Sequence, residues 1–127
     1  GEPEGEVTET SAEDYFASAK LDRQQAKDEV IETFNTIIEN PNSSEQEVES
    51  ANANIASVAE RREKESNIET LVKAKGFNQC VAVVSDEAVN VIVQAEQLDA
   101  AQTIQIKDIV VNECGIDPNQ IKIVEVK

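Results

Sequence analysis

Residues 80–93 read CVAVVSDEAVNVIV and contain two short runs of β-branched residues joined by a polar connection. Residues 80–84 are apolar throughout, and residues 89–93 are apolar apart from Asn90. Runs of this length and composition are typical of β-strands, and a short polar link between two of them favours a reversal of the chain. The segment therefore predicts an antiparallel β-hairpin.

The residues after the hairpin predict a helix and a third strand. The pattern Asp99-x-x-Gln102 is a capping box, and helical spacing follows it as far as Gly115. A turn signal at residues 117–119 precedes residues 121–126, IKIVEV, which alternate as a strand does. We therefore expect a sheet of three strands with one helix between the second and the third.

The residues immediately before the hairpin predict a short helix. Ser66-x-x-Glu69 offers a capping box for a helix that restarts there, and Gly76 suits its end. The order from residue 66 onward is then α-β-β-α-β. We expect residues 66–127 to form one compact domain.

Long helices are expected upstream of this domain. Capping-box patterns occur at residues 10–13 (TSAE) and 44–47 (SEQE), and apolar residues recur every three or four positions after each. The first helical segment should end before Pro41, because the residue preceding proline avoids the helical conformation. The prediction is a helical extension over residues 11–65 and a disordered tail over residues 1–10.

The end of this extension is highly charged. Residues 60–65 read ERREKE, so every side of the helix carries charge at this point. The run is expected to be solvated.

Composition limits the function classes. The chain has 127 residues, 26 acidic against 11 basic side chains and no His, with a net charge of −15 and a sequence pI of about 4.2. Without His there is no zinc triad and no histidine to activate a nucleophile. The four Gly residues stand too far apart for a loop that cradles phosphate. No enzyme and no cofactor are predicted.

The two cysteines, Cys80 and Cys114, fall at the start of a predicted strand and at the end of a predicted helix. They lack Cys-x-x-Cys spacing, so no zinc or redox motif is indicated. Buried small apolar residues are the favoured interpretation, and a disulfide between them is the alternative. A reactive thiol is disfavoured because neighbouring acidic groups raise a thiol pKa.

Clusters of carboxylates leave an acidic cation-binding protein open as an alternative. No stretch matches the calcium-loop pattern, and a helix-borne di-iron site would need His. A solvated acidic face is the favoured interpretation. No catalytic, cofactor-binding or metal-ligating residue is assigned.

The predicted helix over residues 99–115 carries apolar residues on two sides. Ala100, Ile104 and Val111 fall nearly opposite the stripe that should face the sheet. Isolated surface hydrophobes, or cover from the upstream helices, would account for them. The functional interpretation is a partner-binding surface. The sheet-facing stripe consists of Gln102, Thr103, Ile106, Ile109, Val110 and Cys114.

The edges of a three-stranded sheet hold a large share of its backbone hydrogen-bonding groups. Neither strand of the predicted hairpin contains a Pro or Lys that would hinder pairing. Addition of a partner's strand is therefore expected to be available, without an indication of which edge is used.

Several segments together resemble the stage III sporulation protein AH family, in its extracytoplasmic part. They are residues 15–22 (YFASAKLD), residues 60–65, and residues 71–126, in which Lys73-x-x-Gly76-Phe77 forms a hinge-like pattern. The resemblance extends over roughly residues 15–126. It implies an α+β fold with long N-terminal helices followed by a ring-building motif, the α-β-β-α-β domain of type III secretion and flagellar rings.

The resemblance also implies a function and a location. Members of this family are anchored by one N-terminal transmembrane helix in the mother-cell (outer forespore) membrane. Their soluble part lies in the intermembrane space, binds the forespore stage II sporulation protein Q, and helps to form a channel-like complex. A ring-forming homo-oligomer within that complex is implied as well.

No apolar run in the sequence approaches the ~18 residues that span a bilayer. The chain also begins at Gly1 without Met. The membrane anchor is therefore expected in the full-length protein and not in these residues.

The order α-β-β-α-β is also similar to K-homology RNA-binding domains. That alternative needs a Gly-x-x-Gly loop and a basic groove, which the Gly positions and the net charge of −15 do not supply. The sequence therefore predicts a non-enzymatic assembly module that does not bind nucleic acid.

Overall fold

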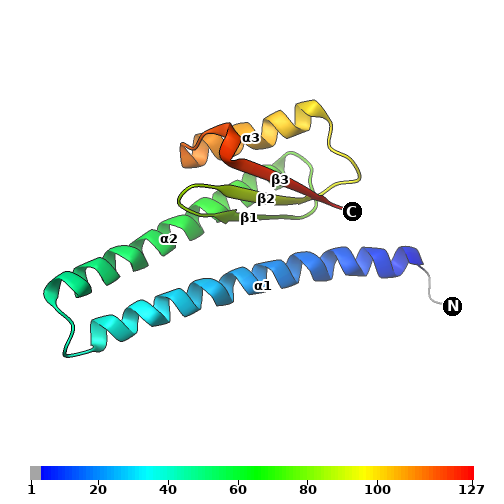
Figure 1. The fold of residues 1–127 in the computed structure, drawn as a ribbon. Helices are drawn as coiled ribbons and strands as arrows, with labels where there is room; N and C mark the ends of the chain where they lie inside the picture. Colours follow the sequence, from blue (N-terminus) through cyan, green and yellow to red (C-terminus); the bar gives the residue numbers. More distant parts are fainter. Residues whose placement is uncertain (1–3) are drawn as a thin grey trace.

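The computed structural model describes residues 4–127 and shows an α+β fold (Figure 1). Two long helices precede a sheet of three strands and a third helix, as predicted. The elements are, in order, α1 (Glu4–Glu39), α2 (Glu45–Ala74), β1 (Cys80–Val84), β2 (Val89–Gln94), α3 (Ala100–Cys114), the 3-10 turn η1 (Pro118–Gln120) and β3 (Ile121–Val126).

The sheet has the order β1-β2-β3 and mixed strand directions. β1 and β2 form the predicted antiparallel hairpin, with Cys80 opposite Val93 and Val84 opposite Val89. β3 pairs with β2 in parallel, with Val89 opposite Ile121. A parallel pair needs a crossover connection, and α3 provides it. β2 is thus the central strand, while β1 and β3 form the two edges.

The main core lies between one face of the sheet and two helices. α3 and the C-terminal half of α2 pack against this face (Figure 1). Alternate strand residues point into it, as strand geometry requires. Its members are Ile68, Val72, Cys80, Ala82, Val84, Val89, Val91, Val93, Ile106, Val110 and Ile121.

The helices α1 and α2 form an antiparallel hairpin whose tip projects beyond the sheet (Figure 1). Ala51 and Val58 of α2 are buried, in agreement with a narrow seam for helix–helix contact. The N-terminal half of α1 passes the sheet on the side away from α3, next to β1, where the Phe16 side chain is only 1% exposed. α1 is therefore both a helical spacer and part of the cover of the sheet.

Two of the four predicted capping boxes are confirmed, and those at residues 10–13 and 66–69 lie inside helices. Ser44 and Asp99 form the predicted capping boxes with the residues three positions on, Glu47 and Gln102. Gly115 ends α3 in the left-handed conformation, with φ of 65°, which glycine adopts without steric cost.

The boundaries of the long helices differ from the predictions. α1 begins at Glu4, so residues 4–10 of the predicted disordered tail continue the helix, while residues 1–3 lie outside the described residues. α2 runs through Ser66 without a restart, because the residues on both sides of this position pack against the sheet.

Within residues 4–127, none of the helices is both long and apolar enough to cross a membrane.

Candidate protein–protein interface

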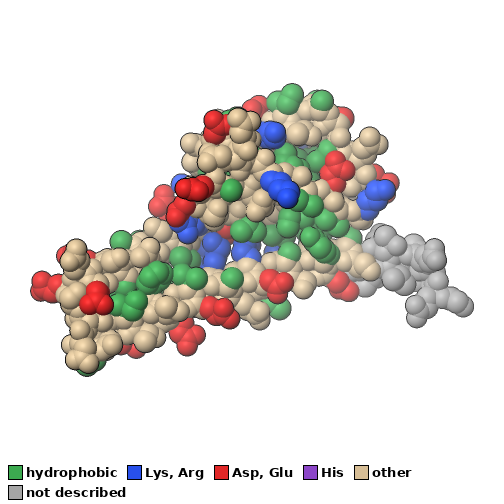
Figure 2. Space-filling model, viewed as in Figure 1, with side chains coloured by type: hydrophobic (Ala, Val, Ile, Leu, Met, Phe, Trp, Pro, Cys, Tyr) green, Lys and Arg blue, Asp and Glu red, His purple; other side chains and the backbone are tan. Residues whose placement is uncertain are grey.

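The outer side of α3 carries the predicted partner-binding residues, but only two of the three are freely exposed. Ile104 is 59% exposed and Ala100 is also exposed, and Figure 2 shows hydrophobic side chains on the surface over α3. Val111 is half-buried and packs against the core. We call Ala100 and Ile104 the α3 patch.

The position of α2 explains the burial of Val111. α2 lies alongside the C-terminal part of α3, where Asn67 donates a hydrogen bond to Glu113 over 2.7 Å. Helical periodicity placed Val111 opposite the sheet, but it took no account of a second helix beside α3. The stripe that faces the sheet is confirmed by the burial of Ile106 and Val110.

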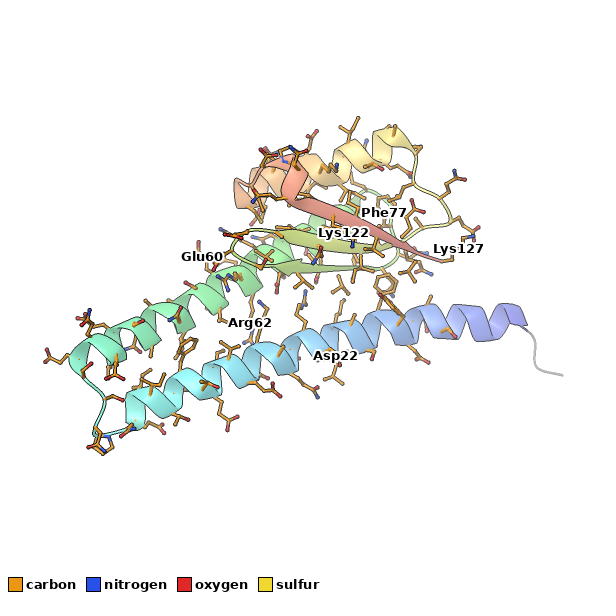
Figure 3. All side chains as sticks on the ribbon, in the orientation of Figure 1. Asp22, Glu60, Arg62, Phe77, Lys122 and Lys127 are labelled. Atoms are coloured by element: carbon orange, nitrogen blue, oxygen red, sulfur yellow. The ribbon has the colours of Figure 1, made fainter. Side chains whose placement is uncertain are left out.

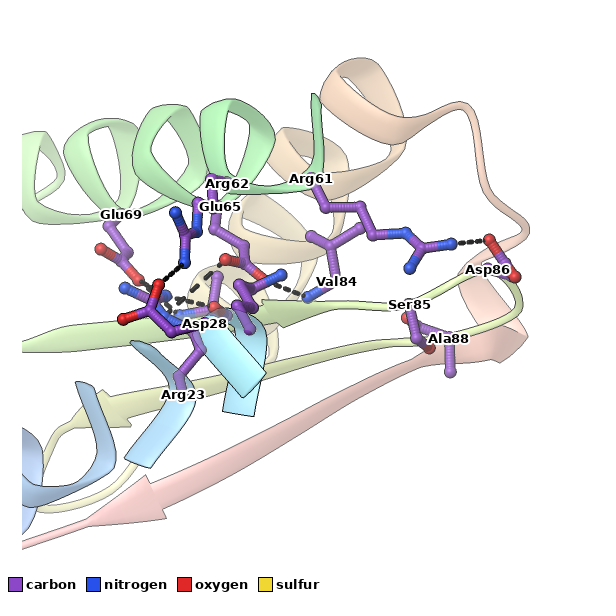
Figure 4. A network of polar contacts seen from close by, with 12 residues as sticks. Arg23, Asp28, Arg61, Arg62, Glu65, Glu69, Val84, Ser85, Asp86 and Ala88 are labelled. Carbon is purple, nitrogen blue, oxygen red and sulfur yellow. Dashed lines mark hydrogen bonds and ion pairs between the residues drawn. The ribbon is translucent and has the colours of Figure 1, made fainter. Parts of the chain in front are cut away.

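The outer edge of β1 is closed by side chains from the helices (Figure 4). The backbone N–H of Val84 donates to Glu65 Oε2 over 2.8 Å, and that of Ala82 donates to Glu69 Oε2 over 2.9 Å. Arg23 of α1 donates to the carbonyl oxygen of Ala82 and to Glu69. These side chains already bond the backbone groups with which an added strand would have to pair, so β1 is not available for strand addition.

Glu65 is the centre of this polar cluster and is only 1% exposed. Its carboxylate lies 3.1 Å from Lys27 Nζ and 3.7 Å from Arg23 Nε, in addition to its bond with Val84. The expectation that residues 60–65 are solvated is therefore wrong at Glu65. Burial is tolerated because two cations and a backbone donor surround the carboxylate.

The cluster has a weak signal in the sequence. Glu65 and Glu69 are four residues apart and lie on one side of α2, about 6 Å apart along the helix axis. Two residues of a strand span about 6.6–6.8 Å, so two carboxylates with this spacing can reach alternate N–H groups of one strand. The spacing alone fits a solvated helix face equally well, so the sequence does not distinguish the two.

The edge of β3 is open by comparison. β3 has a single strand neighbour, β2, and no carboxylate or guanidinium of the described residues bonds its outer backbone. The sequence did not indicate which sheet edge is free, and the bonds at the two edges now distinguish them. Among the described residues, side chains therefore bond the outer backbone of β1 and not that of β3.

A groove of about 410 Å³ lies between the two long helices, over the outward side chain of Val83. Alanine and valine side chains line its floor, and cationic side chains stand around it. It offers a second surface for contact. The lining consists of Ala19, Asp22, Arg23, Ala26, Lys27, Val30, Val58, Arg61 and Val83.

Both cysteines are free thiols, so the disulfide alternative is wrong. Cys80 is buried in the core, and this burial raises the pKa of its thiol to about 12. Burial also raises the pKa of the half-buried Cys114. Neither is an activated nucleophile, which agrees with the interpretation of Cys80 as a buried apolar residue.

The described residues contain no group of three or more His, Cys, Asp and Glu side chains arranged to hold a metal ion. The features of this surface are instead an exposed aliphatic patch, one open sheet edge and a groove. These are features of recognition between proteins.

The fold and these surfaces define a class of protein, the ring-building-motif modules that function in assemblies. The comparisons with known proteins agree with this class and indicate no enzyme family. The family model of the SpoIIIAH-like proteins matches residues 2–123. The chain belongs to the SpoIIIAH-like protein family.

A curated relative is stage III sporulation protein AH of Bacillus subtilis (strain 168). The two sequences are 25% identical over 107 residues, which are 84% of this chain and 49% of the relative. The chain thus spans about half the length of this relative.

Two solved structures share the fold. A chain from the structure of the SpoIIQ–SpoIIIAH pore forming complex matches with a TM-score of 0.76 and 20% identity, over 88% of this chain and 95% of that one. The type III secretion system protein EscJ of enteropathogenic E. coli matches with a TM-score of 0.51 and 24% identity, over 57% of this chain and 49% of that one. The ring-building-motif fold inferred from the resemblance is confirmed.

Proposed function

We propose that this chain is the part of a sporulation membrane protein that binds the forespore protein Q across the intermembrane space and helps to form a channel-like ring. The observation that carries the proposal is the match over 88% of the chain to a structure from the SpoIIQ–SpoIIIAH pore forming complex. The full-length protein would be anchored in the mother-cell (outer forespore) membrane. A ring-forming homo-oligomer would assemble within the complex.

The α3 patch is the proposed contact surface on the helical side of the domain. The exposed Ile104 side chain does not contribute to the core, because residues on the buried side of α3 complete it. Exposed aliphatic side chains of this kind gain free energy when a partner covers them. Val111, half-buried beside it, would support the patch rather than contact the partner.

Binding to a purified protein Q ectodomain tests the proposal. Co-elution in size-exclusion chromatography is expected for the natural sequence and lost in Ile104→Lys. Gln105→Lys is the matched control, because it adds the same charge at the neighbouring exposed position. Failure of the natural sequence to bind protein Q would contradict the proposed function, and equal binding by both variants would remove the α3 patch from it.

A net charge of −15 makes isolated copies repel one another. Tethering on a membrane raises the local concentration and offsets this repulsion. The proposal therefore predicts a monomer in dilute solution and a ring only in the complex or on a membrane.

A further inference from the structure

The direction of the backbone groups along β3 follows from one hydrogen bond. The carbonyl oxygen of Val126 accepts from the N–H of Ala95, at the end of β2, over 3.0 Å. Successive residues of a strand direct their N–H and C=O groups to opposite sides. Ile123 and Glu125 therefore direct theirs away from β2, to the outer edge.

These outward groups are free. The N–H of Ile121, at the start of the strand, is already bonded to the carbonyl oxygen of Pro118. In the part of the chain that the structure describes, no hydrogen bond occupies the outward N–H of Ile123 or Glu125. A partner strand would gain these bonds without displacing any from the fold.

The side chains beside the edge define what a partner strand should carry. Ile121 and Ile123 point to the core side, beneath α3, and continue its apolar layer. Glu125 follows them on that side at the end of the strand. Lys122 points to the opposite side together with Val124 and Val126, and Lys127 follows the end of the strand (Figure 3). Among the described residues, neither lysine forms an ion pair, although acidic side chains outnumber basic ones by 26 to 11.

We propose that the outer edge of β3 binds an extended strand of a partner protein that is aliphatic on the α3 side and carries an acidic side chain opposite Lys122. This proposal rests on the proposed function, because it names the part of the chain that the partner contacts. The backbone bonds provide affinity, and the alternation of side chains provides selectivity.

A second copy of this chain is a less suitable partner for the same edge, because its β3 strand offers Lys122 no acidic residue on the same face. Antiparallel pairing of two β3 strands would bring the Lys122 side chains of both copies to one face of the joined sheet. Like charges across a strand pair are destabilising.

Hydrogen exchange with a defined probe tests the edge directly. We expect the capped peptide VEIEVEIE to slow exchange at the amides of Ile123 and Glu125, by about tenfold once nine-tenths of the sites are filled. The amides of Ala82 and Val84 should not change, because Glu69 and Glu65 already hold them. Unchanged exchange at Ile123 and Glu125 would overturn the proposal.

Proline at the edge separates backbone pairing from side-chain effects. Glu125→Pro removes one outward N–H, a change that edge strands tolerate. Glu125→Ala keeps the N–H and, like the proline variant, loses the weak bond from Leu98 N–H to the Glu125 carboxylate. The peptide should protect the Ile123 amide in the alanine variant and not in the proline variant. Equal protection in both would count against strand addition.

A charge reversal provides a test that does not depend on the folding of the proline variant. Lys122→Glu should weaken binding of VEIEVEIE by about twofold to fivefold. The same variant should bind VKIKVKIK more tightly than the natural sequence does. Affinities that do not respond to this exchange would exclude the selectivity that the proposal assigns to Lys122.

The same variants, applied to the protein Q ectodomain, distinguish the two proposals. Loss of this complex in Glu125→Pro and its retention in Glu125→Ala would support both. Retention in both variants would overturn the edge as the partner's site and leave the proposed function standing. Peptide protection without binding of protein Q to the natural sequence would overturn the proposed function alone.

Discussion

Glu65 connects three parts of the molecule through one side chain. It accepts from the backbone of β1, pairs with Lys27 of α1 and belongs to α2. A buried carboxylate of this kind stabilises little by its mere presence, since burial costs solvation. Removing the carboxylate lowers the stability of the fold, because its hydrogen-bonding and charged partners remain buried without it.

Glu65→Ala is expected to lower the free energy of unfolding by about 3–5 kcal/mol, because it leaves Lys27 and the Val84 N–H without their partner. Urea titration followed by circular dichroism measures the change. Glu63→Ala is the control, since Glu63 is an exposed residue of the same helix and should change stability by less than about 0.5 kcal/mol. Similar losses in both variants would contradict the role assigned to Glu65.

The two thiols should differ in reactivity for reasons of burial. The thiolate is the reactive form, and raising the pKa of Cys80 to about 12 leaves almost none of it at pH 8. Cys114, whose pKa is also raised but which is half-buried, should react with iodoacetamide first, and its rate should rise with pH. Mass spectrometry of partly labelled protein measures the order. Faster labelling of Cys80 in the folded protein would contradict the placement of its thiol in the core.

Among the elements, α2 has two distinct roles along adjacent sides. Ile68 and Val72 enter the core, while Glu65 and Glu69 bond the edge of β1. Both pairs have the four-residue spacing that keeps side chains on one side of a helix. A helix with these two stripes closes one edge of the sheet while it covers the face. Only the β3 edge is left for a partner.

The start of α3 depends on its cap. Asp99→Ala removes the oxygen that accepts from the N–H of Gln102 over 2.7 Å, and it should cost about 1 kcal/mol of stability. Asp108→Ala, at an exposed position within the same helix, should have less effect. Urea titration of both variants makes the comparison. If the two losses were equal, the cap would not be the cause.

On the scale of the whole molecule, α1 completes the domain rather than only extending from it. Phe16 is buried beside the sheet, and Arg23 and Lys27 reach the polar cluster at β1. The opposite end of the helical hairpin projects freely (Figure 1). The molecule therefore has a compact end with the α3 patch and the β3 edge, and an arm that keeps its tip away from them.

A fragment of residues 66–127 is expected not to unfold cooperatively, although the sequence suggests it as a domain. It lacks Glu65 and all of α1, so the Val84 N–H and the Ala82 carbonyl oxygen are left without their partners and the sheet without part of its cover. Thermal circular dichroism and size-exclusion chromatography measure this, with residues 11–127 as the control. A cooperative transition in the short fragment would support the boundary at residue 66.

The features that depend on neighbours in the sequence were predictable. Two of the four predicted capping boxes, the cap at Gly115 and the antiparallel hairpin are formed by residues a few positions apart, so local patterns describe them. The capping-box patterns at residues 10–13 and 66–69 lie inside longer helices, because a local pattern does not show whether a helix has already begun. The α+β class and the two long helices follow from periodicity in the same way. Of the proposed contact residues, Ile104 was identified by its position on the helix and is exposed.

The remaining features required the tertiary structure, because they join distant residues. The Val84 N–H and Glu65 are 19 positions apart, and Arg23 and the Ala82 carbonyl are 59 apart. No local pattern shows which strand edge a helix will approach, or that α2 will half-bury Val111. Whether a hydrogen-bonding group or a charge finds a partner depends on the groups around it. For an edge strand, these groups belong to other elements. The composition therefore already excluded histidine-based sites and a glycine-rich phosphate loop, while packing alone determined that side chains bond the outer backbone of β1 and not that of β3.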